Sequence, residues 1–492
     1  MNYPFFESEV FQLTNAHWVA LSPYLVLCVG IVLTTIAAGF KAKVCTHRSL
    51  VGVTFVATAL AAIYGLGSEA INFFGTSLLI NDMLRWTILA IVGIGFLAAL
   101  FVDEEEHGEW STLLLISTVG LCLLPGARDW VAFFVYLETL AIPGYVLAGL
   151  RLRRDGGFEA SLKYLLMGAF ASALLLMGMT LVYGVAGSFD YAVIRDVVGR
   201  DLFSTMLVAG ALLIAISSAF KVALAPVHMW AADIYQSAPT GIAAFLAGAG
   251  KVAVFMAMLS AFSASGFFEI AVFSKLFMII GAASVIVGNL LALSQKNLRR
   301  MLAYSSVASA GYVALTLPVG ETAGTAILLY LVTYALGFLL CFACLEGLVR
   351  ITGKPSTASL EISDLKQVDS KKAGLIVALF SLGIFSMAGI PPLPGFLGKY
   401  LMISDLWSAG HTAAAIWIIT GSMLGLAYYL KIMVPLYLDS PSGNKTVSLR
   451  SSVKGPLASA GLALVLMFVW VWAFAYMAPS NSDMSTARVE AR

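Results

Sequence analysis

The residues best suited to chemistry are charged side chains that lie inside long apolar segments. Lys221 lies in AFKVALAPVHMW, within an apolar segment near residues 203–236. Pro226 follows five residues later and is expected to break a helix, because proline lacks an N–H and clashes with the preceding turn. A lysine at the centre of a membrane span costs roughly 2.5–3.5 kcal/mol on insertion scales, so it normally faces a bundle interior or a water-filled path. A buried charge beside a helix break therefore indicates ion-transport chemistry.

The second half of the chain repeats this pattern. Another long apolar segment contains SMAGIPPLPGFLGKYLM, in which Lys399 follows Pro394 by five residues. Two interrupted hydrophobic segments at corresponding positions indicate a transporter that is built from inverted repeats.

Four more lysines fall inside apolar segments: Lys163, Lys251, Lys275 and Lys431. Lys275 and Lys431 can be explained by snorkelling or by contacts with other spans. Lys163 follows Glu159 by four residues, the spacing of an ordinary helix ion pair. Lys251 has no such explanation, and we group it with the lysines beside the two breaks as a candidate proton carrier.

The acidic counterpart is Glu138, inside the apolar run VYLETLAIPGYVLAGL. A buried carboxylate needs a positive partner, or it takes up a proton. Pairing with Lys221 would keep both groups charged, and drawing the lysine to another partner would release the carboxylate to bind a proton. The alternative is a static ion pair between two spans. His228, two residues after Pro226, fits a relay role and a packing role equally well.

The composition is that of a membrane protein. Hydrophobic residues make up 60% of the chain and charged residues 11%, with a mean hydropathy of +0.92, whereas a soluble domain carries about 25% charged residues. The net charge of +2 and the lack of a basic tract give no sign of nucleic-acid binding. No glycine-rich dinucleotide loop and no cysteine set for an iron–sulfur cluster are present, so no redox centre and no metal site are expected in this chain.

The fold expected is an all-α polytopic membrane bundle, because spans of about 20 apolar residues recur with short connections. Fourteen spans are predicted, near residues 18–39, 51–67, 84–102, 111–125, 130–150, 159–185, 203–236, 240–262, 270–293, 301–317, 323–349, 374–406, 412–436 and 456–478.

The connections between the predicted spans differ in charge. Most loop lysines and arginines fall on one side, in connections such as residues 41–48, 151–154, 296–300, 350–372 and 445–454. The positive-inside rule places these connections in the cytoplasm, and both termini outside. The longest inner connection, 350–372, is polar and rich in Ser and Thr, and we expect a surface linker.

Longer stretches carry a family resemblance, which covers roughly residues 110–435. The chain resembles the antiporter-like membrane subunits of the bacterial NADH:quinone oxidoreductase, respiratory complex I, and most closely the subunit N family. The matching stretches, in order, are LETLAIPGYVLAGL, FEASLKYLLMGAF, FKVALAPVHMWAADIYQSAPT with GKVAVF, GNLLALSQKNLRRMLAYSS, AGIPPLPGFLGKY and GLAYYLKI.

The resemblance implies a fourteen-helix fold in which spans 4–8 and 9–13 are inverted repeats and spans 7 and 12 are discontinuous. The domains implied are residues 1–109, with spans 1–3; 110–262 and 263–436, the two repeats; and 437–492, an inner loop, span 14 and an outer tail. It also implies proton-pathway roles for Glu138, Lys221, Lys251 and Lys399, and Lys163 matches a further lysine of the family.

The function implied is proton translocation coupled to quinone reduction elsewhere in a complex. NADH, flavin, iron–sulfur clusters and quinone would then bind to partner subunits, and the partners would include another antiporter-like subunit, a small helical subunit and the lipid bilayer. The location implied is the bacterial cytoplasmic membrane. One alternative is a subunit of a multisubunit cation/proton antiporter without a redox partner. Another is a membrane spacer that has lost pumping, against which the costly intramembrane lysines argue.

The chain departs from the family pattern in three places. Relatives usually have a histidine where SSVASAGY has Ser309, a Thr-Pro pair where this chain has Ala231 and Ala232, and a proline where it has Gly241. If that histidine relays protons, then Ser309, Tyr304 or water must substitute here, or the path differs. The break in the seventh span would rest on Pro226 alone.

Overall fold

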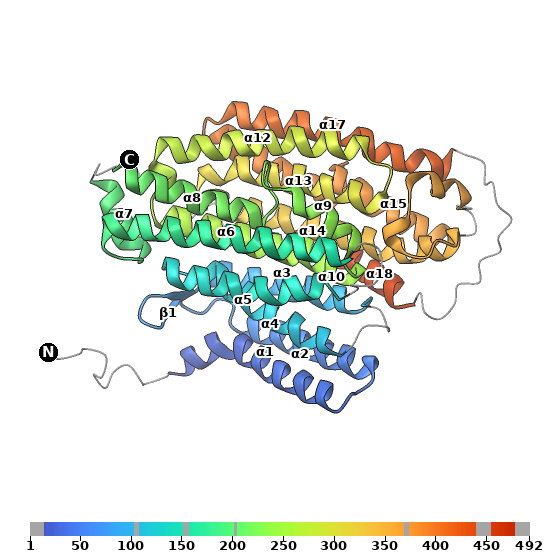
Figure 1. Cartoon of the computed structure of the whole chain (residues 1–492), viewed down its shortest axis with the longest axis horizontal. Coiled ribbons are helices and arrows are strands. Elements are labelled where there is room, and N and C mark those ends of the chain that lie inside the picture. The colour runs from blue at the N-terminus through green and yellow to red at the C-terminus, as the bar shows by residue number, and fades with distance from the viewer. Residues whose placement is uncertain are drawn as a thin grey trace.

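The structure is a computed structural model of the 492-residue chain, and it describes residues 14–102, 108–150, 157–200, 204–368, 373–438 and 454–477. Helices dominate and run roughly side by side along the long axis (Figure 1). By length and composition, 12 of the described helical segments could cross a membrane. The predicted all-α polytopic membrane fold is confirmed.

The N-terminal part forms one edge of the bundle (Figure 1). It contains α1 (Asn15–Gly39), α2 (Val44–Tyr64), β1 (Ile71–Phe73), β2 (Leu78–Ile80) and α3 (Asp82–Ala99). Helix α1 packs against α2 and α4, and α2 packs against α3. The strands form a short antiparallel hairpin in which Ile71 pairs with Ile80. This hairpin was not predicted from the sequence.

The next spans make up the first predicted repeat. They are α4 (Glu109–Leu123) with η3 (Leu124–Gly126), α5 (Trp130–Ala148), α6 (Gly157–Ala186), a short α7 (Tyr191–Gly199), α8 (Thr205–Lys221), α9 (Met229–Ser237), α10 (Thr240–Phe245), the π-helical segment η4 (Leu246–Gly250) and α11 (Lys251–Ala264).

The second predicted repeat follows, and then the last span. These elements are η5 (Phe267–Glu269), α12 (Ala271–Ser294), α13 (Leu298–Thr316), η6 (Leu317–Val319), η7 (Glu321–Ala323), α14 (Gly324–Thr352), η8 (Thr357–Ser359), η9 (Ile362–Gln367), α15 (Gly374–Ala388), α16 (Pro394–Ser408), α17 (Thr412–Tyr437) and α18 (Lys454–Met477).

Equivalent helices of the two halves have equivalent neighbours. Helix α4 packs on α5 as α12 packs on α13, and α6 packs on α8 and α9 as α14 packs on α15 and α16. Each half has five spans, an odd number, so successive copies must enter the membrane from opposite sides. This pattern agrees with inverted repeats, and the exact domain boundaries stay a prediction.

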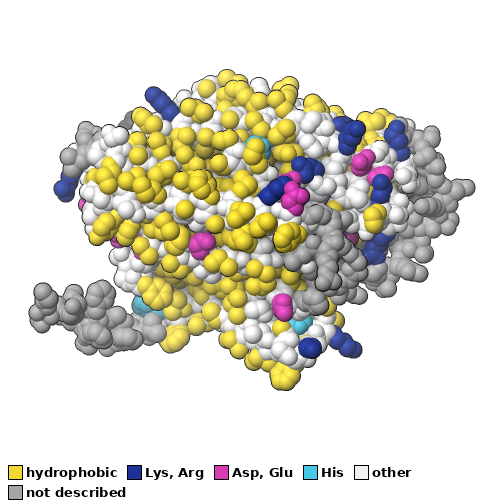
Figure 2. Space-filling view, viewed as in Figure 1, with side chains coloured by type: hydrophobic (Ala, Val, Ile, Leu, Met, Phe, Trp, Pro, Cys, Tyr) yellow, Lys and Arg dark blue, Asp and Glu magenta, His cyan; other side chains and the backbone are white. Residues whose placement is uncertain are grey.

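The bundle has an enclosed centre and an apolar outer surface. The apolar stretch of α14 is buried throughout, and the span from α10 to α11 is almost as enclosed. Helices α1, α2, α6, α12 and α18 have less than half of their apolar stretches buried. Hydrophobic side chains cover the flank, and many lysines and arginines lie toward one end of the helices (Figure 2). An apolar exterior of this kind is stable only against lipid or partner helices.

The expectation of a surface linker at residues 350–372 is wrong for its described part. Leu360 and Leu365 are fully buried. Ile362 N–H donates to the Lys296 carbonyl at 2.9 Å, and Leu298 N–H donates to the Leu360 carbonyl at 3.0 Å. A few apolar residues within a polar stretch are therefore enough to fold it against the ends of the neighbouring helices.

Candidate functional site

The first helix break separates α8 from α9, as predicted. Backbone groups freed in a membrane must find partners within the protein, because lipid offers none. Here Ala225 N–H donates to Ser284 Oγ at 2.8 Å, and the Phe220 carbonyl accepts the Trp230 indole N–H at 3.0 Å. The break between α8 and α9 is thus stabilised by hydrogen bonds to Ser284 of α12 and Trp230 of α9.

The structure brings Glu138 and Lys221 together at this break. Lys221 Nζ lies 3.5 Å from Glu138 Oε1, and the two side chains are 3% and 20% exposed. Lys221 Nζ also donates to the Tyr145 hydroxyl at 3.1 Å, and the Ser172 hydroxyl donates to Glu138 Oε1 at 2.5 Å. Lys221 is the last residue of α8, where the exposed carbonyls of a helix end favour a cation.

The second break, between α15 and α16, surrounds Lys399. The buried ammonium donates to the carbonyls of Met387 and Ala388 at 3.1 and 2.8 Å, at the end of α15. Gly389 follows with a φ of +83°, in the region that glycine favours. A Cβ at this position would lie 3.0 Å from Lys399 Nζ. The Lys399 ammonium is therefore held by the C-terminal end of a half-helix, as cations are in other transporters with broken helices.

Lys251 lies between the two breaks in sequence and begins α11. It is 5% exposed, and its ammonium donates to the Ser306 carbonyl of α13 at 2.5 Å. The π-helical turn η4 ends at the residue before it, and such turns are frequent at functional sites. Among the described residues, no carboxylate lies within 4.0 Å of Lys251 or Lys399. These two lysines are not members of static ion pairs in the described part of the chain.

His228 precedes α9 and is also buried. Its ring lies edge-on to the ring of Tyr304, with a centroid separation of 6.4 Å. Its Nδ1 is buried and has no hydrogen-bond partner in the parts of the chain that the structure describes. His228 therefore lies against Tyr304 of α13, and within the described chain one ring nitrogen is free for a hydrogen bond.

Lys163 lies apart from the three buried lysines. Its side chain is half exposed and pairs with Glu159 at 2.6 Å and with Asp233 at 3.7 Å. Asp233 in turn pairs with Arg300 at 2.7 Å. Lys163 thus belongs to an ion-pair network near the ends of α6, α9 and α13.

The other two lysines of the spans have simpler surroundings. Lys431 is exposed and donates to the carbonyls of Leu293 and Gln295 at 3.0 and 3.2 Å, where α12 ends. Lys275 is exposed on α12. Both positions agree with the interpretation that these lysines snorkel or contact other spans.

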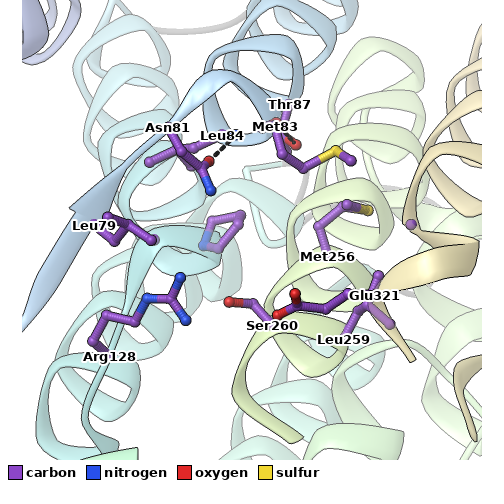
Figure 3. Close-up of a pocket in the computed structure, with 13 residues that line it drawn as sticks. Leu79, Asn81, Met83, Leu84, Thr87, Arg128, Met256, Leu259, Ser260 and Glu321 are labelled. Carbon is purple, nitrogen blue, oxygen red and sulfur yellow. Dashed lines mark hydrogen bonds between the residues drawn. The ribbon is translucent and has the colours of Figure 1, made fainter. Parts of the chain in front are cut away.

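A cavity of about 200 Å³ lies near the ends of α3, α5, α11 and α14. Arg128, Ser260 and Glu321 point into it from three different segments (Figure 3). Ser260 is nine residues after Lys251, and nine steps of 100° place it on the opposite face of α11. The cavity therefore does not open onto the Lys251 ammonium.

Two hydroxyl partners of the buried charges were missed by sequence reasoning. Tyr145 follows Glu138 by seven residues, so the spacing already placed both on one face of a helix. Ser172 lies on another span and carries no sequence signal. The π-helical turn before Lys251 was missed for the same reason, because nothing in AGAGK distinguishes it from a regular helix.

Comparison with known proteins decides the family. Residues 127–425 match the family model described as NADH:quinone oxidoreductase/Mrp antiporter, transmembrane region. The chain belongs to this antiporter family. The resemblance inferred from the sequence is confirmed.

Several relatives of this antiporter-family chain are named NADH-quinone oxidoreductase subunit N. NADH-quinone oxidoreductase subunit N of Trichlorobacter lovleyi is 35% identical, over 87% of this chain and 89% of the relative. The subunit N of Sphingopyxis alaskensis is 31% identical, over 89% of this chain and 92% of the relative.

Solved structures agree with the fold. A chain of Thermus thermophilus respiratory complex I with bound aureothin is 28% identical and superposes with a TM-score of 0.76, over 92% of this chain and 98% of that one. A chain of the Mrp complex from a Dietzia species superposes with a TM-score of 0.78 at 20% identity, over 94% of this chain and 96% of that one, and this likeness concerns the fold alone.

Proposed function

We propose that this antiporter-family chain is a proton-translocating subunit N of an NADH:quinone oxidoreductase in a bacterial cytoplasmic membrane. The observation that carries the proposal is the burial of three lysines on three different spans, of which only Lys221 has a carboxylate partner in the described part of the chain. Burying an unpaired lysine in a membrane is costly, and such residues mark ion pathways.

The proposed relay starts at the pair of Glu138 and Lys221. Protonated Lys221 is stabilised by the carboxylate 3.5 Å away. When its proton passes to Lys251 through intervening water, Glu138 loses its cationic partner and becomes free to take up a proton. Each transfer therefore changes the proton affinity of the neighbouring group, and this dependence is the coupling that a pump requires.

Lys399 completes the relay and exchanges protons with one side of the membrane. The helix-end carbonyls at Met387 and Ala388 stabilise its charged form, so a proton can rest there between transfers. His228 and Lys163 are further candidates, at the α8–α9 break and in the ion-pair network with Asp233. We place both termini on the periplasmic side, following the distribution of basic residues in the loops.

Redox chemistry belongs to partner subunits in this proposal. NADH, flavin, iron–sulfur clusters and quinone bind there, and no cofactor binds to this chain. Helices α1 to α3 and α18 lie outside the repeated spans, and α1, α2 and α18 expose apolar side chains. They are the surfaces proposed for another antiporter-like subunit and a small helical subunit.

A subunit of a multisubunit cation/proton antiporter is the second candidate, because the matching family model is described as covering Mrp antiporters as well. The two candidates differ in their partners. Purification in mild detergent, followed by mass identification of the accompanying chains, is expected to recover subunits with flavin and iron–sulfur clusters. Recovery of the chain as a stable monomer, or only with other antiporter subunits, would overturn the oxidoreductase assignment.

A functional test separates the proposed proton-translocating subunit from an inert spacer. In membrane vesicles with matched amounts of assembled complex, Lys251→Ala is expected to lower NADH-driven proton pumping and quinone reduction together. Lys275→Ala is the control, because Lys275 is exposed on α12. Normal pumping by Lys251→Ala would contradict the relay.

A further inference from the structure

Helix α13 contacts the two lysines that lack carboxylate partners. The Ser306 carbonyl accepts a hydrogen bond from the Lys251 ammonium. Tyr312, six residues later, lies beneath the Lys399 ammonium, with its ring centroid 5.5 Å from Lys399 Nζ. At 100° per residue, Ser305, Ser306 and Ser309 fall within one 100° arc of the helix. A row of hydroxyl groups therefore begins at the Lys251 contact and extends along one face toward Lys399.

Two of these serines are hydrogen-bonded to tyrosines of α14. Ser309 Oγ lies 2.8 Å from the Tyr330 hydroxyl, and Ser305 Oγ lies 3.1 Å from the Tyr334 hydroxyl. All four residues are at most 5% exposed. A hydroxyl can donate one hydrogen bond and accept two, so the Ser309–Tyr330 pair can accept a proton on one oxygen while it releases one from the other. Ser305 donates to the Leu302 carbonyl at 2.7 Å, so Tyr334 is the donor within the second pair, and Ser305 must turn its O–H away from that carbonyl to pass a proton on.

A small cavity lies among these hydroxyl groups and Lys399. It measures about 10 Å³ and is lined by both serines, both tyrosines, Lys399 and Ser422. This volume is about the minimum that holds one water molecule. Ser422 Oγ is buried beside Tyr312 and forms no hydrogen bond of good geometry with a described residue. A water at this point would satisfy that hydroxyl.

Lys399 has a donor left for such a water. An ammonium carries three N–H groups, and two of them bind the Met387 and Ala388 carbonyls. The cavity is therefore a position where one water contacts both the terminal lysine and the hydroxyl pairs of α13 and α14.

We infer that protons pass from Lys251 to Lys399 through the hydroxyl groups of Ser305, Ser309, Tyr330 and Tyr334 and one water, without an intervening imidazole. This inference rests on the proposed function and assigns the residues of its middle segment. Relatives usually have a histidine at the position of Ser309, and Ser309, Tyr304 or water could replace it. We assign the role to Ser309 together with water, because Tyr304 lies against His228 instead.

The transfer balances without any other reactant. Protonated Lys251 leaves the Ser306 carbonyl, its flexible stem turning, and gives a proton to a hydroxyl oxygen. That hydroxyl pair releases its own proton to the cavity water, and the water gives a proton to the neutral Lys399 amine. The O–H bonds of the pairs then rotate back, so that one proton has moved and no group is oxidised or reduced.

The hydroxyl groups could instead serve only to hold α13 against α14, and variants distinguish these roles. Tyr330→Phe and Ser309→Ala each remove one hydroxyl and keep the packing nearly unchanged. Thr333→Val is the matched control, because Thr333 is fully buried on α14 between the two tyrosines, and its hydroxyl bonds to the Leu329 carbonyl of its own helix at 2.9 Å.

The experiment measures NADH-driven proton pumping in vesicles that contain the whole complex, at matched amounts of assembled enzyme. Tyr330→Phe is expected to slow pumping about tenfold, the factor that corresponds to one lost buried hydrogen bond. The solvent deuterium isotope effect should rise as this transfer becomes limiting, and Thr333→Val should pump normally. A purely structural role would lower the yield of complex and leave the isotope effect of the assembled enzyme unchanged.

Lys399→Ala, assayed in parallel, separates two kinds of failure. If Lys399→Ala pumps normally, the proposed function itself is wrong. If Lys399→Ala abolishes pumping while Tyr330→Phe and Ser309→Ala retain the normal rate, the relay stands and the hydroxyl path is refuted.

Discussion

The exchange of Glu138 for glutamine tests the electrostatic basis of the relay most directly. The substitution keeps the shape of the side chain and removes its charge. Opposite unit charges 3.5 Å apart attract by about 5 kcal/mol at an effective dielectric constant of about 20. Protonated Lys221 therefore loses about 5 kcal/mol of stabilisation, equivalent to more than three powers of ten in a protonation equilibrium. Lys221 should then hold its proton less often and supply the next transfer more slowly.

The assay is membrane-potential generation by NADH in inverted vesicles, normalised to the amount of assembled complex. Glu138→Gln is expected to pump at least about tenfold more slowly, a smaller factor than the full electrostatic loss because water can enter the site. Glu269→Gln is the control, since Glu269 is 54% exposed and lies 3.6 Å from the exposed Arg195. An exposed pair of this kind is worth about 1 kcal/mol or less.

A double variant shows whether the pair acts as a unit. Combining Glu138→Gln with Lys221→Ala should be no worse than Lys221→Ala alone, because both substitutions interrupt the same step. Normal pumping by Glu138→Gln, or additive losses in the double variant, would refute the reasoning and leave the pair with a structural role.

Two further predictions follow from the packing. Lys399→Ala should abolish pumping in assembled complex. Lys431→Ala should retain most of it, because Lys431 is exposed and only binds carbonyls where α12 ends. Equal losses in the two variants would contradict the role of Lys399 as a proton carrier. Arg299→Ala should lower the thermal unfolding midpoint of the complex, since buried Arg299 donates to the Ala238 carbonyl at 2.7 Å and to Thr357 at 2.9 Å and hydrogen bonds to charged groups are worth about 1.5–3 kcal/mol each. Arg195→Ala, at a side chain 59% exposed, should leave that midpoint unchanged.

Features that depend on local chemistry could be read from the sequence. The breaks follow from proline in apolar segments, and the importance of Lys221 and Lys399 follows from the cost of burying a charge near such a break. The pairing of Glu138 with a lysine of the broken span followed from the need to neutralise a buried carboxylate. Each of these inferences uses a residue type whose physical demands are strong wherever it lies.

Features that depend on tertiary contacts could not be read in this way. The folding of residues 353–368 over the helix ends depends on what Leu360 and Leu365 meet, and their polar surroundings in sequence indicate a linker. The π-helical turn before Lys251 arises in an ordinary Ala/Gly stretch. The bond between Ser309 and Tyr330 joins two helices, and neither residue is distinctive alone.

Gly389, which follows α15, offers a way to move the Lys399 ammonium without removing its charge. A single methyl group at Gly389 would press on the lysine side chain, since a Cβ there would lie 3.0 Å from both its Cδ and its Nζ. The ammonium would then shift from the Met387 and Ala388 carbonyls while the lysine itself remained. Replacing Lys399 removes both the position of its ammonium and its ability to bind a proton. A substitution at Gly389 would change the position alone. Gly389 thus limits, to within a fraction of an ångström, where the Lys399 ammonium can hold a proton. Insertions or larger side chains in this turn should therefore be excluded by their size rather than by their polarity.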